Sequence, residues 1–79
     1  MTNDDIRIAV AAARNWSDFY SIDVQGNGDP HGTPAQCLLA GIYNAEWMIE
    51  EGKLDANDDA AVRHIVIADL DNMHPDLVA

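Results

Sequence analysis

Basic residues and cysteines are scarce in this sequence, and each shortage excludes a class of protein. Four lysines and arginines stand against 14 aspartates and glutamates, so the 79 residues carry a net charge of −10. Nucleic acids and anionic membranes both attract basic surfaces, so neither is an expected direct ligand. Cys37 is the single cysteine, so no internal disulfide can form. A reducing cytoplasm therefore suits the chain better than a secreted, disulfide-stapled scaffold.

Long apolar runs are missing as well. No run approaches the roughly 20 residues of a membrane-spanning helix. The chain begins with the acidic stretch "MTNDDIRIAV", where a secretory signal would be basic. We therefore expect a cytoplasmic protein with no membrane segment. The hydrophobic fraction of 48% is ample for a folded core, and the length favours one domain over residues 1–79.

The clearest expected element is a helix over residues 34–51. Thr33 is a favourable N-cap, Pro34 suits the first helical position, and Gln36 completes a capping box. Gly52 stands where a left-handed residue ends a helix. The apolar positions with helical spacing that predict its core face are Leu38, Gly41, Ile42, Ala45, Met48 and Ile49.

The same helix carries a second apolar stripe, formed by Leu39, Tyr43 and Trp47 at positions i, i+4 and i+8. We call these three residues the aromatic stripe. It has three possible uses: packing beneath the N-terminal segment, forming a homodimer, or anchoring a partner. Packing beneath the N-terminal segment is the most economical, because the central helix of a small domain touches both of its neighbours.

A second long helix is expected to end near Met73, with Asp58 and Asp59 near its start and Asn57 or Asp55 as its cap. Pro75 disfavours helical backbone at the residue before it, so the helix ends there. The short connection from the first long helix predicts an antiparallel helical hairpin. The apolar face of this second helix comprises Val62, Ile65, Val66, Leu70 and Met73.

The first third of the chain admits two structures. A possible Thr2–Asp5 capping box and an alanine run favour a helix over about residues 3–15. Alternating apolar residues, including "YSIDV" at 20–24, are also compatible with a β-hairpin. We expect an all-α, three-helix arrangement, with an α+β fold as the alternative. A spacing of four and three residues also supports the helix, and the residues that follow it are Ile6, Val10, Ala13, Ser17 and Tyr20.

No constellation of residues predicts catalysis, a metal site or a cofactor. Asp69 falls on the apolar face of the second long helix, and we expect it to accept hydrogen bonds from a tryptophan N–H, a tyrosine hydroxyl or a backbone amide. Cys37 lacks the signature of a nucleophile and is interpreted as a buried packing residue. His31 and His64 are both expected to be solvent-exposed.

Acidic residues crowd the end of the expected hairpin, opposed within that stretch by Lys53. Glu46 and Glu50 are one helical turn apart, about 5–6 Å between Cβ atoms, which is comparable with phosphate spacing on a nucleic-acid strand. This density favours a basic protein as partner. The six acidic residues, called the acidic end below, are Glu46, Glu50, Glu51, Asp55, Asp58 and Asp59.

In size, acidity and helical character, the chain resembles the small acidic proteins with which phages block host nucleic-acid machinery, including anti-CRISPR proteins. Some members of that group present carboxylates where DNA phosphates would bind. The resemblance implies a non-enzymatic inhibitor of a basic nucleic-acid-binding protein, acting through the acidic end and the aromatic stripe. The alternative is a small oligomerising structural or adaptor module whose acidity provides solubility.

Overall fold

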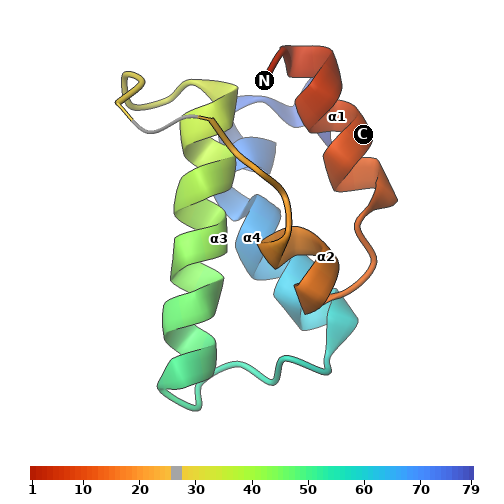
Figure 1. The fold of residues 1–79 in the computed structure, drawn as a ribbon, viewed down its shortest axis with the longest axis vertical. Helices are drawn as coiled ribbons and strands as arrows, with labels where there is room; N and C mark the ends of the chain where they lie inside the picture. Colours follow the sequence, from red (N-terminus) through yellow and green to blue (C-terminus); the bar gives the residue numbers. More distant parts are fainter. Residues whose placement is uncertain (26–27) are drawn as a thin grey trace.

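The computed structural model describes residues 1–25 and 28–79. Its elements, in chain order, are α1 (Asn3–Ala12), α2 (Trp16–Tyr20), α3 (Pro34–Glu50), α4 (Asp59–Met73) and the short 3-10 helix η1 (Pro75–Leu77) (Figure 1). Helix accounts for 65% of the described part, which contains no strand. The expected all-α class is confirmed, and the α+β alternative is wrong.

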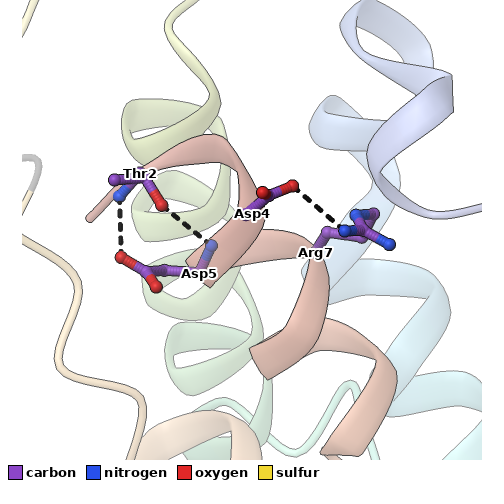
Figure 2. Close-up of polar contacts among 4 residues, drawn as sticks. All are labelled: Thr2, Asp4, Asp5 and Arg7. Carbon is purple, nitrogen blue, oxygen red and sulfur yellow. Dashed lines mark hydrogen bonds and ion pairs between the residues drawn. The ribbon is translucent and has the colours of Figure 1, made fainter.

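Helix α1 begins with the predicted capping box. The Thr2 hydroxyl accepts a hydrogen bond from the Asp5 amide at 3.1 Å, and the Asp5 carboxylate accepts one from the Thr2 amide at 3.0 Å (Figure 2). Arg7 pairs with Asp4 at 3.0 Å on the exposed face of the same helix. The two hydrogen bonds of the capping box satisfy backbone donors that the first turn of a helix leaves without partners.

Helix α1 ends earlier than expected, because the chain turns into extended backbone at Ala13. Asn15 then caps α2, its side chain accepting a hydrogen bond from the Asp18 amide at 3.0 Å. The Asp18 carboxylate accepts in return from the Arg14 amide at 2.9 Å. The expected continuous helix to residue 15 is therefore wrong, and a short separate helix follows it.

This break decides which N-terminal residues reach the core. Ile6, Val10 and Ala13 are buried as the helical spacing predicts, but Ser17 and Tyr20 are exposed because α2 has a new direction. Phe19 is fully buried in their place. Phe19 of α2 thus takes the place in the core that a longer first helix would have given to Ser17 and Tyr20.

Helices α3 and α4 form the expected antiparallel hairpin and make the most extensive contact between elements (Figure 1). Their backbones come into contact at Gly41, where a Cβ atom would overlap the carbonyl oxygen of Val66. Met48 and Ile49 are half-buried at the far end of the α3 core face. The buried residues of the interface are Leu38, Gly41, Ile42, Ala45, Val62, Val66 and Leu70.

Both predicted ends of α3 are observed, with one difference. The Thr33 hydroxyl accepts from the Gln36 amide at 3.3 Å, but the Thr33 amide donates to the Pro30 carbonyl instead of to Gln36. The capping box is therefore half formed, and Gln36 Oε1 is buried with no hydrogen bond inside the described residues. At the other end, Gly52 takes the predicted left-handed conformation, with φ of +73°.

Helix α4 has a different cap from the one predicted. Asp58 accepts from the Ala61 amide at 3.2 Å and is the N-cap. Asp55 accepts from the Asn57 amide at 2.9 Å and shapes the preceding loop. The expectation that Asn57 or Asp55 caps the helix is therefore wrong. The loop continues through Asn57, and the N-cap is the next residue, Asp58. The predicted end near Met73 is confirmed.

The capping box makes a contribution to stability that we expect to depend on pH. Hydrogen bonds from the Thr2 amide and then the Thr2 hydroxyl hold the pKa of Asp5 below its usual value of 3.8. A lowered folded-state pKa stabilises the fold above the unfolded-state value, and this contribution disappears as the pH falls through the folded-state value. Asp5→Asn should therefore destabilise the protein at pH 7, and the difference from wild type should shrink below about pH 4.

Urea unfolding followed by circular dichroism at pH 7 and pH 3 measures this difference. Asp23→Asn removes an exposed carboxylate outside the helices and controls for net charge. Thr2→Ala should lower stability by about 1 kcal/mol at pH 7, the usual contribution of an N-cap side chain. A loss for Asp5→Asn that is equal at both pH values would contradict the linkage.

Candidate protein-binding site

The acidic end is a single region of the molecule. Helices α3 and α4 run antiparallel and are joined through residues 51–58, so the last turn of α3 and the first turn of α4 lie at the same end of the molecule, at the two ends of the connecting loop (Figure 1). Glu46 is half-buried one turn before this end, and the other five acidic residues are exposed. The structure therefore places the acidic residues that the sequence singled out at or near one end of the hairpin.

The six carboxylates differ in what they already bind. Asp58 caps α4 and Asp55 holds the loop, so both serve the fold. Glu46, Glu50, Glu51 and Asp59 make no hydrogen bond or ion pair within residues 1–25 and 28–79, but Asp59 lies in the first turn of α4, where its negative charge complements the helix dipole. These three glutamates are the carboxylates that a partner can engage without disrupting local structure.

The helix dipole opposes two of these glutamates. Glu50 is the last residue of α3 and Glu51 is its C-cap. The carboxyl end of a helix carries partial negative charge, so anionic side chains there are unfavourable by about 0.3–1 kcal/mol each. Helix stability therefore gives no reason for acids at these two positions.

The aromatic stripe runs along α3 beside these glutamates and is open to solvent. Tyr43 is 62% exposed, Trp47 is 49% exposed, and Leu39 is half-buried. The expectation that the stripe packs beneath the N-terminal segment is wrong for its two aromatic residues. Phe19 and α1 instead reach the shared core, so the outer side of α3 is left uncovered.

Lys53 adds a contact that was not predicted from the sequence. Its amide donates to the Met48 carbonyl at 2.8 Å, and the Gly52 amide donates to Ile49 at 3.1 Å, which together form a Schellman-type helix end. The turn brings the Lys53 ammonium over the ring of Trp47, 4.5 Å from the ring centroid. Gly52 was the available signal, because a left-handed residue there folds the next side chain back on the helix.

Two other expectations concern Asp69 and Cys37. Asp69 is exposed and accepts no hydrogen bond inside the described residues, so its expected role as a structural hydrogen-bond acceptor is wrong. Cys37 is 5% exposed, which confirms the interpretation as a packing residue. Burial raises the pKa of the Cys37 thiol, and the Asp69 carboxylate raises it further. Both effects disfavour the thiolate that a nucleophile requires.

A surface cavity of about 310 Å³ lies beside Cys37, between the start of α3 and the end of α4. His31, Gln36, Asp69 and Met73 also line it. Across the part of the chain that the structure describes, no three histidine, cysteine, aspartate or glutamate side chains are grouped to hold a metal ion. The helices of that part include none with the length and apolar character to cross a membrane.

Comparison with protein-family models, curated proteins and solved structures gave no match to this chain. A function must therefore be argued from the acidic end and the aromatic stripe themselves. The second half of α3, with its C-cap, carries Tyr43, Trp47, Glu46, Glu50 and Glu51, so carboxylates and exposed aromatic side chains share this part of the helix. Exposed aromatic residues with a charged rim are typical of protein-binding surfaces.

Proposed function

We propose that this protein is a non-enzymatic inhibitor of a basic, nucleic-acid-binding protein. Its acidic end would occupy the partner surface on which nucleic-acid phosphates otherwise bind. The observation that carries the proposal is the group of three unengaged glutamates, Glu46, Glu50 and Glu51, on a packed helical hairpin. A rigid support matters because it presents the charges without a further loss of conformational entropy on binding.

Charge complementarity also supports this proposal. The net charge of −10 steers a basic partner toward the molecule, and steering of this kind raises association rates. Glu46 and Glu50 follow one another at a helical-turn spacing of about 5–6 Å, similar to successive phosphates. The aromatic stripe beside them would supply apolar contacts that phosphates lack, and so make the complex tighter than a purely ionic one.

A displacement assay tests the proposal. The partner is first captured from host lysate on the immobilised protein and identified by mass spectrometry. The purified partner is then loaded with a labelled DNA duplex, and the unlabelled protein is added. We expect release of the DNA at stoichiometric concentrations, weakening as salt rises because exposed charges are screened beyond about 8 Å at 0.15 M salt. A captured protein that keeps its DNA would contradict the proposal.

The exposed aromatic rings favour a second candidate, a module that associates with itself. Pairing of two aromatic stripes across a two-fold axis would bury Tyr43 and Trp47 at a homodimer interface. Such a pairing also brings Glu46 and Glu50 of both copies close together. Because like charges repel, this association should strengthen as salt rises, which is opposite to the dependence expected for the inhibitor.

Sedimentation velocity of wild type beside Trp47→Ala tests self-association. For the module candidate, we expect a concentration-dependent dimer in the wild type and a monomer in the variant. Trp47 is half exposed, so the variant should remain folded. Tyr20→Ala removes an aromatic residue of similar exposure on α2 and serves as the control. A wild type that stays monomeric at millimolar concentration removes this candidate.

A further inference from the structure

The exposed face of Trp47 is already occupied by a cation from the same chain. The Lys53 ammonium lies 4.5 Å from the ring centroid, and both side chains are on the surface. A cation over an indole ring is attracted by the negative face of the π-system, and tryptophan is the strongest of the aromatic residues in this respect. The contact shows that this ring has the orientation and surroundings to hold a cationic side chain.

The backbone fixes this arrangement. Gly52 adopts φ of +73°, and the Lys53 amide is held by the Met48 carbonyl at 2.8 Å. Lys53 therefore starts from a defined position at the end of α3, and the long side chain needs only to fold back one turn to reach Trp47. Its ammonium makes no ion pair in the described residues, so the ring is the partner that the structure gives it.

We propose that Trp47 is a binding site for an arginine or lysine side chain of the basic partner, and that Lys53 is an intramolecular competitor for it. This inference rests on the proposed function, because it names the chemistry that the same surface recognises. A second copy of this chain is a poor occupant, since it would bring its own glutamates toward Glu46 and Glu50. A cationic segment instead meets carboxylates and an aromatic face together.

Binding of such a segment exchanges one cation for another. The partner's guanidinium or ammonium takes the face of the ring, and Lys53 moves into solvent. Arginine is favoured over lysine, because its planar guanidinium stacks on an aromatic ring and is more weakly hydrated. The carboxylate of neighbouring Glu50 can accept a hydrogen bond from the same guanidinium, since it makes no hydrogen bond or ion pair in the described residues.

The test compares Lys53→Gln with Arg14→Gln. Both substitutions remove one positive charge and leave a net charge of −11, which follows from −10 − 1. Arg14 is exposed between α1 and α2, and its side chain contacts no aromatic ring in the described residues. The probe is a fluorescein-labelled nona-arginine peptide at 0.15 M salt, with binding measured by fluorescence anisotropy.

We expect Lys53→Gln to bind the peptide about two- to fivefold more tightly than Arg14→Gln, the range typical of an exposed cation–π contact. In a Trp47→Leu background the two variants should bind equally, because Lys53 then has no ring to cover. Equal affinities in the wild-type background would overturn the inference, and so would a difference that persists in Trp47→Leu.

This test separates the inference from the proposed function. The peptide assay needs no natural partner, so it reports on the ring even if the protein displaces no DNA from its captured partner. Conversely, the protein could displace DNA while the two variants bind the peptide equally. That result would support the proposed inhibitor and contradict the proposed cation site at Trp47. In the wild type, the Lys53 methylene resonances should be shifted upfield by the indole ring and return toward ordinary values when the peptide is added.

Discussion

Gly41→Ala should destabilise this protein by about 3 kcal/mol or more, at the upper end of overpacking effects. The reason is steric: the new Cβ atom would overlap the Val66 carbonyl oxygen, and backbone atoms cannot move aside as a flexible side chain does. Helices α3 and α4 must separate, and the buried side chains between them lose contact. For a domain of this size a loss of about 3 kcal/mol lowers the melting temperature by roughly 12–24 °C.

The sign of this effect is informative because helix propensity predicts the opposite. Replacing glycine by alanine inside a helix normally gains about 1 kcal/mol. Asn44→Ala is the matched control, since Asn44 is exposed on the same helix and its replacement adds no contact with α4. Thermal unfolding followed by circular dichroism should show the control at or slightly above wild type. A Gly41→Ala protein as stable as the control would mean that α3 and α4 do not touch at this point.

The sequence predicted the helical hairpin well because its signals are local. Thr33, Pro34 and Gly52 each favour one backbone conformation without help from distant residues, and all three act as expected. The close approach at Gly41 was not predictable. A glycine on an apolar face indicates a narrow contact, but only the assembled structure identifies Val66 as the opposing residue.

The N-terminal third was predicted less accurately because two local signals compete there. Apolar spacing continues through Ala13 to Tyr20 as if one helix ran on. Asn15 followed by Asp18 is a capping pattern that starts a new helix, and this pattern prevails. The break lets Phe19 enter the core, and that burial is a tertiary effect that periodicity alone does not contain.

In the candidate site too, some features were predictable from the sequence and others depend on tertiary packing. The grouping of acids at one end followed from the short connection between two antiparallel helices, so the sequence could predict it. Exposure of Tyr43 and Trp47 could not be predicted, because it depends on which stripe of α3 the other helices leave uncovered. Asp69 was misplaced for a related reason: the buried line of α4 follows Val66 and Leu70, and Asp69 lies outside it.

Reversing the three unengaged glutamates is the decisive test of the proposed inhibitor. In Glu46→Lys/Glu50→Lys/Glu51→Lys, each substitution changes the charge by two, so the net charge goes from −10 to −4. Asp55 and Asp58 stay unchanged because their carboxylates hold the loop and cap α4. The variant should be at least as stable as wild type, since lysine at the end of α3 complements the helix dipole by about 0.3–1 kcal/mol per site.

The matched control carries the same change of charge at the opposite end of the hairpin, in Asp29→Lys/Asp71→Lys/Asp76→Lys. All three aspartates are exposed, and Asp71 is in the last turn of α4, so both variants gain a lysine at a helix end. We expect the glutamate variant to need about 100-fold more protein to displace DNA, corresponding to roughly 1 kcal/mol for each reversed contact. The aspartate control should lose only the small part of its ability to displace DNA that depends on overall charge. Equal displacement by the two variants would mean that net charge, and not the position of Glu46, Glu50 and Glu51, drives binding, and would remove the phosphate-mimic mechanism.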